Sequence, residues 1–363
     1  MSKIINIPKL RFKEFSGVWE DKLIGQILTV GSGKDYKHLS NGDIPVYGTG
    51  GYMLSVNDYL YDGESVGIGR KGTIDKPIFL TGKFWTVDTL FYTHSFKNSV
   101  PKFIYSIFQR INWKLYNEAS GVPSLSKSTI EKIKIFIPSK HEQEKIASFL
   151  ISIDTRIEQL TKKEQLLQQY KKSVMQKIFN QEIRFKDDDG SEFHEWEDSS
   201  LGDVLDYVQP TKYLVKDTEY DNSYNTPVLT AGKTFILGYT NETDGIFENN
   251  LPVIIFDDFT TANKFVDFPF KAKSSAMKIL IPKNNNNIKF IYEAMQMIKY
   301  EVGGHERHWI SKFTFLNIFM PCIKEQTKIA NFLSSIDKKI ELTTKELNST
   351  KEFKKALLQQ MFI

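Results

Sequence analysis

The sequence predicts an α+β protein with two mixed domains, each followed by a long helix. Short runs of β-branched and aromatic residues, separated by Gly, Asn and Asp, predict strands, and residues 102–116 and 288–300 predict short helices between them. A stretch that begins at Glu142 recurs 183 positions later at Glu325. Because the repeat keeps its register to the end of the chain, it predicts a pseudo-twofold internal repeat.

The repeat is strongest in the two helical segments and weaker in the blocks before them. Glu142-Gln143 and Lys145-Ile146-Ala147 recur as Glu325-Gln326 and Lys328-Ile329-Ala330, and the earlier markers Arg11-Phe12-Lys13 and Trp19-Glu20-Asp21 recur as Arg184-Phe185-Lys186 and Trp196-Glu197-Asp198. Between these markers the blocks diverge, which suggests two similar modules that read different targets. We therefore expect domains at residues 1–140 and 182–323, with spacer helices at residues 141–181 and 324–363.

Composition limits the class of protein. A chain of 363 residues is long enough for two domains with separate cores. The one cysteine, Cys322, excludes a disulfide framework, and no apolar run reaches membrane-spanning length, so we expect a cytoplasmic protein without a membrane partner.

The net charge of +4 is unevenly distributed. Residues 1–180 hold 26 Lys and Arg against 17 Asp and Glu, whereas residues 181–363 hold 22 against 27. In the second block, binding to a nucleic acid therefore requires a local basic patch. The candidates for it are Lys264, Lys271, Lys273 and Lys278.

Each copy of the repeat ends in an apolar stripe with coiled-coil spacing. Ser139 and Glu142 predict a capping box at the start of the first helix, whereas Cys322 is a weaker cap for the second. The stripe consists of Ile146, Leu150, Ile153, Ile157, Leu160, Leu167, Val174 and Ile178 in the first helix, and of Ile329, Leu333, Ile336, Ile340, Leu347, Leu357 and Met361 in the second.

The length of the helices suggests that they pack on each other. About 38 residues rise roughly 57 Å, which exceeds the width of a small domain. The alternative is that each stripe docks on its own domain. Since the second domain begins where the first helix ends, a packed pair must be antiparallel, with one domain at each end.

Three apparent catalytic motifs do not fit their expected context. Gly67-Ile68-Gly69-Arg70-Lys71-Gly72 has dinucleotide-loop spacing, but the following Thr73-Ile74-Asp75-Lys76-Pro77 cannot form the required helix. Ala231-Gly232-Lys233-Thr234 resembles the end of a phosphate loop, yet a strand-like run follows it. Asp257-Asp258 lacks nuclease-type partners and fits a turn or a base contact better. The six histidines do not cluster with Cys as a zinc site requires, so we expect no catalytic or metal site.

The same segments fit recognition loops better. They combine Gly-flanked backbone with hydroxyls, amides and cations, and Arg can bind guanine bidentately while Lys mostly holds phosphate. For any single residue, an ordinary solvated loop side chain is the alternative. The candidate DNA contacts are Lys34, Thr49, Gly50, Gly51, Tyr52, Arg70, Lys71 and Lys83 in the first block, and Thr230, Lys233, Asp257, Asp258, Thr260, Thr261, Asn263, Lys264, Lys273, His305, Arg307 and His308 in the second.

With these motifs, the chain resembles the specificity subunits of type I restriction–modification systems. The resemblance spans all 363 residues and is carried by Leu10-Arg11-Phe12 with Trp19, by Ser120-Gly121 with Leu125-Ser126, and by Pro138 with Glu142-Gln143 and Lys145-Ile146-Ala147. It implies two target-recognition domains, each reading one half of a bipartite site in double-stranded DNA. It also implies that the helices set the gap between the half-sites and dock two methyltransferase subunits.

The resemblance places catalysis in the partners of this chain. S-adenosylmethionine belongs to the methyltransferase subunits, which methylate adenine, and ATP and Mg belong to the restriction subunits. The sequence agrees, because an adenine methyltransferase needs an Asn or Asp-Pro-Pro-Tyr or Phe loop and no Pro-Pro pair occurs here. The alternative function is a tandem carbohydrate- or protein-binding adhesin with a coiled-coil spacer, whose binding should barely respond to salt.

Overall fold

The computed structural model describes residues 6–232, 234–300 and 308–363. The chain divides into two compact units, of which unit 1 is Met1–Lys163 with Thr343–Ile363 and unit 2 is Glu164–Leu342. Each unit thus combines one globular domain with part of both long helices. None of the helices in the described ranges has the length and apolar character needed to cross a membrane.

The long helices are α4 (Lys140–Phe179) and α8 (Ile323–Gln360). At the start of α4 the Ser139 hydroxyl accepts a hydrogen bond from the Glu142 backbone N–H at 3.4 Å. The Glu142 carboxylate instead binds Arg11 and Trp19. The capping box expected from the sequence is therefore only half formed, because a tertiary ion pair takes its second member.

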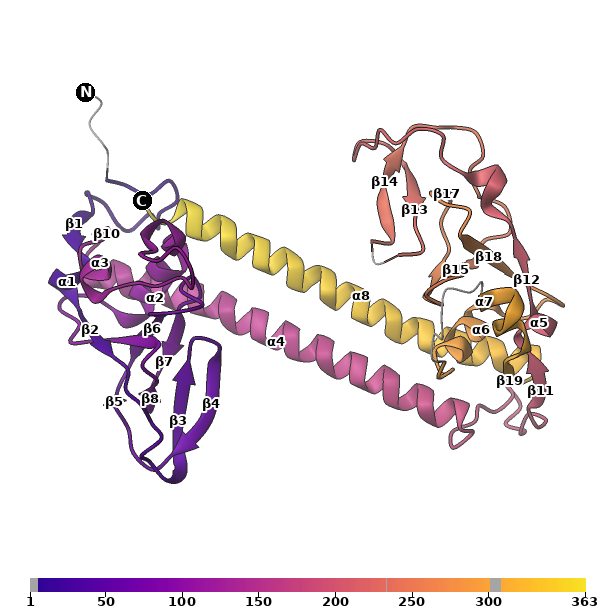
Figure 1. Cartoon of the computed structure of the whole chain (residues 1–363), viewed down its shortest axis with the longest axis horizontal. Coiled ribbons are helices and arrows are strands. Elements are labelled where there is room, and N and C mark those ends of the chain that lie inside the picture. Colours follow the sequence, from indigo (N-terminus) through magenta and orange to yellow (C-terminus); the bar gives the residue numbers. More distant parts are fainter. Residues whose placement is uncertain (1–5, 233, 301–307) are drawn as a thin grey trace. The chain divides into compact units, whose positions relative to one another are not determined.

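Unit 1 contains two four-stranded sheets and a strand pair (Figure 1). The first sheet has the order β2-β9-β6-β7, with β2 (Thr29–Ser32), β9 (Leu90–His94), β6 (Ser65–Gly69) and β7 (Ile78–Leu80). The second has the order β4-β3-β8-β5, with β4 (Gly51–Val56), β3 (Asn41–Gly48), β8 (Lys83–Thr86) and β5 (Tyr61–Asp62). The pair is β1 (Glu20–Leu23) with β10 (Lys134–Ile137), and the helices are α1 (Ile24–Ile27), α2 (Pro101–Arg110), η1 (Trp113–Tyr116) and α3 (Lys127–Glu131).

Unit 2 repeats this plan. Its larger sheet has the order β12-β18-β15-β16, with β12 (Leu205–Val208), β18 (Met277–Pro282), β15 (Val253–Asp257) and β16 (Asn263–Val266). The smaller has the order β14-β13-β17, with β14 (Ile236–Thr240), β13 (Thr226–Leu229) and β17 (Lys271–Ala272). The pair is β11 (Glu197–Ser200) with β19 (Asn317–Met320), and the helices are α5 (Leu201–Val204), η2 (Pro210–Tyr213), α6 (Ile288–Met295), α7 (His308–Ser311) and η3 (Phe313–Phe315).

The two short helices expected from the sequence are shorter in the structure than predicted. Helix α2 ends at Arg110 because Ile111 adopts an extended backbone, and the separate 3-10 helix η1 follows it. Helix α6 ends at Met295 rather than at Tyr300. Apolar residues continue past both ends, so hydrophobic periodicity alone did not reveal where the backbone turns.

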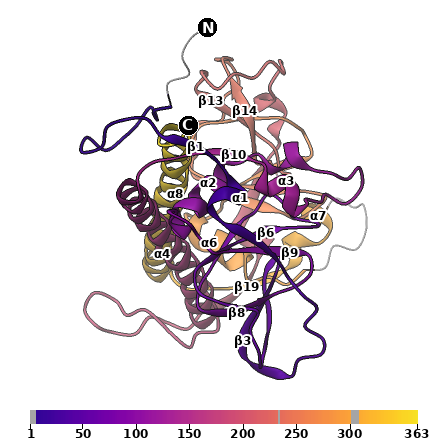
Figure 2. The same cartoon turned by 90° about the vertical axis from the view of Figure 1, so that its left-hand side faces the viewer.

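The strand pairing shows that both units share one topology. In unit 1, β3 forms a hairpin with β4 (Figure 1). Strand β3 also pairs in parallel with β8, whose label stands next to that of β3 in Figure 2. In unit 2, β13 forms a hairpin with β14 and pairs in parallel with β17. The remaining strand pairs are antiparallel in both units. The fold is thus mixed α/β, as expected.

The ends of the long helices belong to the globular cores. In unit 1, residues from the start of α4 and the end of α8 join the cluster around Trp19 and Phe103. In unit 2, the end of α4 and the start of α8 join the cluster around Trp196 and Phe290. The stripe residues Ile157, Leu167 and Ile340 are partly exposed, and the others are buried. Docking on a domain, the alternative considered above, therefore describes the helix ends.

Candidate nucleic-acid interface

A buried glutamate at the start of each long helix holds the frame of each unit. In unit 1, Arg11 donates two hydrogen bonds of 2.7 Å to the Glu142 carboxylate, and the Trp19 indole N–H donates a third at 3.3 Å. Such bidentate pairs are directional as well as strong. They fix the entry of the first strand against the helix.

Unit 2 builds the same contact from the repeated residues. Arg184 Nη2 lies 2.9 Å from Glu325 Oε2, and Trp196 Nε1 donates to the same oxygen at 3.1 Å. The Glu325 carboxylate raises the pKa of Arg184 above its ordinary value, against an opposing effect of burial. The markers that revealed the repeat in the sequence are thus the residues that fix the frame.

The glutamine after each glutamate fixes the start of the short helix. Gln143 Oε1 accepts the Val100 backbone N–H at 2.9 Å, just before α2. Gln326 Oε1 likewise accepts the Asn287 N–H at 2.9 Å, and Asn287 caps α6. The frame therefore extends from the long helices to α2, which packs on β6 and β7, and to α6, which packs on β15 and β16.

Three segments meet at one end of the sheets in unit 1. They are the β3–β4 hairpin tip, the turn after β6 and the turn between β8 and β9. The Val87 N–H donates to the Tyr47 carbonyl at 3.0 Å, and the Arg70 N–H donates to the Thr89 carbonyl at 2.8 Å. The Leu125 N–H also donates to the Arg70 carbonyl at 2.9 Å, so the loop before α3 joins the group.

These backbone contacts bring most of the candidate residues of unit 1 together. Arg70 and Lys71 are exposed on the turn after β6, and Thr49, Gly50, Gly51 and Tyr52 form the hairpin tip. Lys34 is exposed, and its backbone N–H donates to the Thr86 carbonyl at 2.9 Å. Lys83 is the exception, because it starts β8 at the opposite end and lies 4.8 Å from the Tyr59 ring centre.

Unit 2 brings the equivalent three segments together. The Lys273 N–H donates to the Leu229 carbonyl at 2.9 Å, as Val87 does to Tyr47 in unit 1. The Asp258 N–H donates to the Ala276 carbonyl at 3.4 Å, and the Asp258 carbonyl accepts the His308 N–H at 2.9 Å. Asp258 thus occupies the place of Arg70.

Several candidates in unit 2 prove to be structural. Asp258 is 2% exposed, and its carboxylate accepts the Trp309 N–H at 2.9 Å and lies 3.7 Å from Lys278 Nζ. Asp257 accepts the Phe259 N–H at 3.0 Å and the Thr260 hydroxyl at 2.8 Å, which closes the turn. His308 is also buried, next to the Tyr300 hydroxyl. A direct DNA contact by Asp258 or His308 was a wrong hypothesis, because both are enclosed by the core.

The basic patch expected in unit 2 was also wrong in part. Lys271 is 1% exposed and lies 2.8 Å from Glu242 Oε2, and Lys278 is 1% exposed and packs over the Tyr207 ring. Lys264 is exposed and Lys273 is half-buried, so these two alone can meet a phosphate. Counting charges in the sequence cannot distinguish buried from exposed lysines, because a lysine side chain in a strand can point into the core or toward solvent.

The remaining described candidates of unit 2 lie between β15 and β16, at the start of β16, or in the β13–β14 hairpin tip. Thr260 is exposed, Thr261 and Asn263 are half-buried, and Thr230 uses its hydroxyl to bond the Thr234 carbonyl at 2.6 Å within the hairpin tip. Lys233, His305 and Arg307 lie outside the described residues. Within the described ranges, no three His, Cys, Asp or Glu side chains group in a way that could hold a metal ion.

Comparison with protein families identifies the family of this chain. A family model described as the type I restriction modification DNA specificity domain matches residues 17–168 and again residues 194–352. The chain belongs to this family. The two matches fall on the two copies of the repeat, which agrees with a duplicated DNA specificity domain.

Individual relatives agree. The chain is 50% identical over 164 residues to the Escherichia coli EcoR124I/EcoR124II specificity subunit, an alignment that covers 42% of this chain and 41% of that protein. It is 25% identical over 343 residues to the Methanocaldococcus jannaschii MjaVIII specificity subunit, covering 84% of this chain and 78% of that one. The fold resembles the crystal structure of an M. genitalium type I S subunit, with a TM-score of 0.75, 16% identity and coverage of 98% and 99% of the two chains.

Two polar residues of the interface were missed by sequence reasoning in this specificity-domain chain. Asp88 and Thr89 form the turn between β8 and β9 that receives Arg70, and the Asp88 carbonyl accepts a long hydrogen bond of 3.4 Å from Arg70 Nη1. The signal was a short polar break between the apolar runs Phe84–Val87 and Leu90–Tyr92. It marks a turn, but only the fold shows that this turn meets the hairpin tip.

Proposed function

We propose that the chain is the non-catalytic DNA specificity subunit of a type I restriction–modification complex, and that each domain reads one half of a bipartite site. The single observation that carries this is the pair of equivalent loop clusters, built on the same backbone but with different polar side chains. Phosphate contacts position such a module and base contacts give it specificity. The adhesin alternative receives no support from the family or the relatives.

The domain boundaries remain part of the proposal, with recognition domains at residues 1–140 and 182–323 and spacer helices at residues 141–181 and 324–363. Matched ion pairs support an antiparallel arrangement of the spacers, because Asp154 of α4 pairs with Lys354 of α8, and Lys171 of α4 pairs with Asp337 of α8. We infer a coiled-coil spacer with a pseudo-twofold axis. Duplex DNA has the same local symmetry, so two half-sites on opposite strands suit such a subunit.

The partners in this proposal are double-stranded DNA, two methyltransferase subunits and the restriction subunits. S-adenosylmethionine would be held by the methyltransferase subunits, and ATP and Mg by the restriction subunits. This chain would supply the DNA-reading side chains and the helical surface on which the methyltransferases dock. A cytoplasmic location completes the proposal.

Mapping methylated adenines tests the proposal directly. The chain is co-expressed with its methyltransferase, and the methylated motif is determined for the wild type and for a variant whose residues 1–140 come from a relative. One half of the motif should change, while the other half and the gap stay the same. If both halves change together, the two-module function is wrong.

A second experiment tests the spacer. Insertion of one heptad after Gln165 and another after Asn348 preserves the apolar stripe and adds about 10 Å of helix rise to each segment. The gap between unchanged half-sites should grow by about two to four base pairs, at roughly 3.4 Å per step. An active variant that methylates only the original spacing would show that the helices do not set the gap.

A further inference from the structure

A lysine on a long helix contacts the same kind of partner in both units. In unit 1, Lys354 Nζ lies 2.6 Å from Asp154 Oδ1, and in unit 2, Lys171 Nζ lies 2.6 Å from Asp337 Oδ1. Both lysines belong to the internal repeat. The residues that surround them on the short helices α2 and α6 can therefore be compared position by position.

Helices α2 and α6 carry nearly the same side chains at equivalent positions. Phe103 and Phe290 set the equivalence, because they pack against Trp19 and Trp196 respectively. By this alignment, Lys102, Tyr105 and Gln109 match Lys289, Tyr292 and Gln296. One position differs in character: Ser106 of α2 stands where α6 has Glu293.

In unit 1 the helix lysine engages the glutamine. Lys354 Nζ donates to Gln109 Oε1 at 2.8 Å in addition to its contact with Asp154. Lys102 turns to Glu64, with 3.3 Å between Nζ and Oε1. Gln109 therefore serves the contact between α2 and the long helix.

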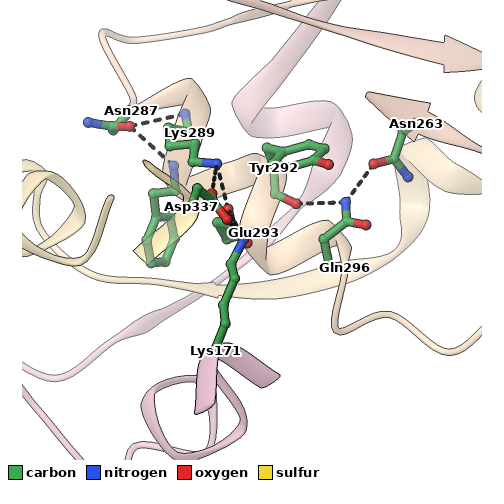
Figure 3. A network of polar contacts seen from close by, with 9 residues as sticks. Lys171, Asn263, Asn287, Lys289, Tyr292, Glu293, Gln296 and Asp337 are labelled. Carbon is green, nitrogen blue, oxygen red and sulfur yellow. Dashed lines mark hydrogen bonds and ion pairs between the residues drawn. The ribbon is translucent and has the colours of Figure 1, made fainter. Parts of the chain in front are cut away.

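In unit 2 the glutamate replaces the glutamine in this contact (Figure 3). Glu293 is fully buried, and its Oε1 lies 3.0 Å from Lys171 Nζ and 2.6 Å from Lys289 Nζ. Lys289 Nζ also lies 2.7 Å from Asp337 Oδ2, so two lysines and two carboxylates alternate in a closed ring. Gln296 has no part in this ring.

Gln296 instead binds a residue of the candidate DNA interface. Its Nε2 donates to Asn263 Oδ1 at 2.6 Å and to the Tyr292 carbonyl at 3.0 Å (Figure 3). Asn263 begins β16, two residues after Thr261, and is half-buried. The Asn263 Nδ2 in turn donates to the Thr261 carbonyl at 3.3 Å. The two bonds fix the amide orientation of Asn263 and leave one lone pair on Oδ1 and one N–H on Nδ2 for a base.

Among the described residues of unit 1, this bond has no counterpart. Phe79 and Phe265 align the edge strands β7 and β16, since their rings lie 5.7 Å and 5.8 Å from Tyr105 and Tyr292. On this alignment, Pro77 occupies the place of Asn263. Proline has no side-chain amide that could accept this hydrogen bond. The glutamine that does not bind the helix lysine, Gln296, and the amide that it binds, Asn263, therefore occur together in unit 2.

Stability alone does not account for the charged ring. A buried ion cluster repays its desolvation only in part, and apolar replacements are often as stable. Burial by itself would lower the pKa of Lys289, but Glu293 and Asp337 raise it above its ordinary value, so the lysine stays charged. Unit 1 joins the same elements with a serine at this position. The ring is better explained by what it does to Gln296.

We propose that Asn263 is a specificity-determining residue of the second half-site, that Gln296 is its positioning residue, and that Glu293 releases Gln296 by taking its place on Lys171. An asparagine amide with a fixed orientation suits adenine, whose N6 donates and N7 accepts in the major groove. This role depends on the DNA-reading function proposed above.

The test uses the complete complex with its methyltransferase and a DNA library randomised in both half-sites. Asn263→Ala should relax discrimination at one base pair of the second half-site by about tenfold or more. Gln296→Met and Glu293→Ser should relax the same base pair, the latter because Lys171 can then bind Gln296 as Lys354 binds Gln109. The matched control is Gln109→Met in unit 1, which should leave both half-sites unchanged.

The first half-site reports that each variant complex is folded and active. An unchanged motif in Asn263→Ala would overturn the proposal. A motif relaxed by Asn263→Ala but not by Gln296→Met would overturn the positioning role. If Glu293→Ser fails to assemble, Gln296→Met decides, since Gln296 is exposed and outside the ring. A wild-type complex that methylates adenine at no bipartite motif would instead refute the proposed function itself.

Discussion

Arg70 of unit 1 and Asp258 of unit 2 occupy the same backbone position but have opposite charge and opposite exposure. Arg70 follows β6 and Asp258 follows β15, an inner strand of each sheet. The Arg70 carbonyl accepts the Leu125 N–H, from the loop before α3, and the Asp258 carbonyl accepts the N–H of His308, which begins α7, both at 2.9 Å. Arg70 is exposed, whereas Asp258 is enclosed by Lys278 and the Trp309 N–H. A shared backbone position can thus hold a candidate base reader in one unit and a core residue in the other.

A second pair differs in the same way. Strand β8 places Trp85 beside Val46, and strand β17 places Lys271 beside Val228. Unit 1 fills this position with an aromatic ring, and unit 2 fills it with a lysine paired to Glu242. The duplicated frame therefore accommodates quite different interiors. What both units keep is the Arg–Glu–Trp contact at the start of each long helix.

The largest expected effect concerns that common contact. Glu142→Ala and Glu325→Ala each leave a mostly buried arginine without its carboxylate, which costs about 3 to 5 kcal/mol. The free energy of unfolding, measured with urea, should fall by similar amounts in the two variants. Glu144→Ala, at an exposed position of α4, is the control and should change little. A large loss in only one variant would show that the two frames are not equivalent.

The Lys271–Glu242 pair should make unit 2 sensitive to acid. Burial alone would raise the pKa of Glu242, but Lys271 and the backbone N–H groups of Lys216 and Asp217 lower it to about 2 from an ordinary 4.5. A depressed carboxyl pKa stabilises the fold above the unfolded pKa, and this contribution disappears as the pH falls through the folded pKa. The stability that Glu242 adds is therefore present at neutral pH and is lost between pH 4.5 and about 2.

The measurement compares the wild type with Glu242→Gln across this range. Their unfolding free energies should differ most near neutral pH and should converge toward pH 2. Glu248→Gln, an exposed change in the same unit, serves as the control for general charge effects. A difference that stays constant with pH would mean that Glu242 contributes through packing and not through its charge.

The Arg70 and Asp258 comparison predicts opposite consequences for DNA reading. Arg70→Ala should weaken or relax the first half-site by about 1 to 3 kcal/mol if the guanidinium reads guanine, without lowering the free energy of unfolding. Asp258→Asn should instead destabilise unit 2, because Lys278 loses its buried counter-charge. Methylated-motif mapping and urea unfolding of both variants separate these effects. Equal DNA affinity and an unchanged motif in Arg70→Ala would show that Arg70 is an ordinary solvated side chain.

The sequence was sufficient for the frame but not for the exposure of individual side chains. The register of the repeat identified Glu142 and Glu325, and the Gly-flanked segment that contains Arg70 was assigned to a loop, which follows directly after β6. Burial could not be predicted, because an Asp or Lys in a strand can point to either face, and a short loop does not reveal which neighbour will cover it. Lys271, Lys278, Asp258 and His308 were misplaced for this reason.

Long-range pairings were equally hidden. Gln296 reaches Asn263 because the end of α6 lies beside the start of β16, and Arg70 reaches the Asp88 carbonyl because the ends of β6 and β8 lie close together. Strand order, which the sequence did not predict, decides both contacts. The equivalence of Ser106 and Glu293 emerges only when α2 and α6 are aligned in the structure, and the effect of the exchange on Gln296 depends on where the helix lysines lie.

The smallest expected effect tests whether exposed ion pairs on the long helices matter. Arg156 of α4 contacts Glu346 of α8 within unit 1, and both side chains are about half exposed, at 53% and 47%. Such pairs are screened by water and salt and typically contribute about 0.2 to 1 kcal/mol. The equivalent positions in the repeat are Lys163 and Lys339, two like charges, so this ion pair is not part of the common frame.

Arg156→Ala should therefore lower the free energy of unfolding by less than about 1 kcal/mol, and added salt should reduce the difference further. Lys354→Ala is the informative comparison, because Lys354 is only 13% exposed and also binds Gln109, so its loss should cost more. If Arg156→Ala proved as costly as Lys354→Ala, the helix pair would depend on its surface charges and not on the buried contacts that both units repeat.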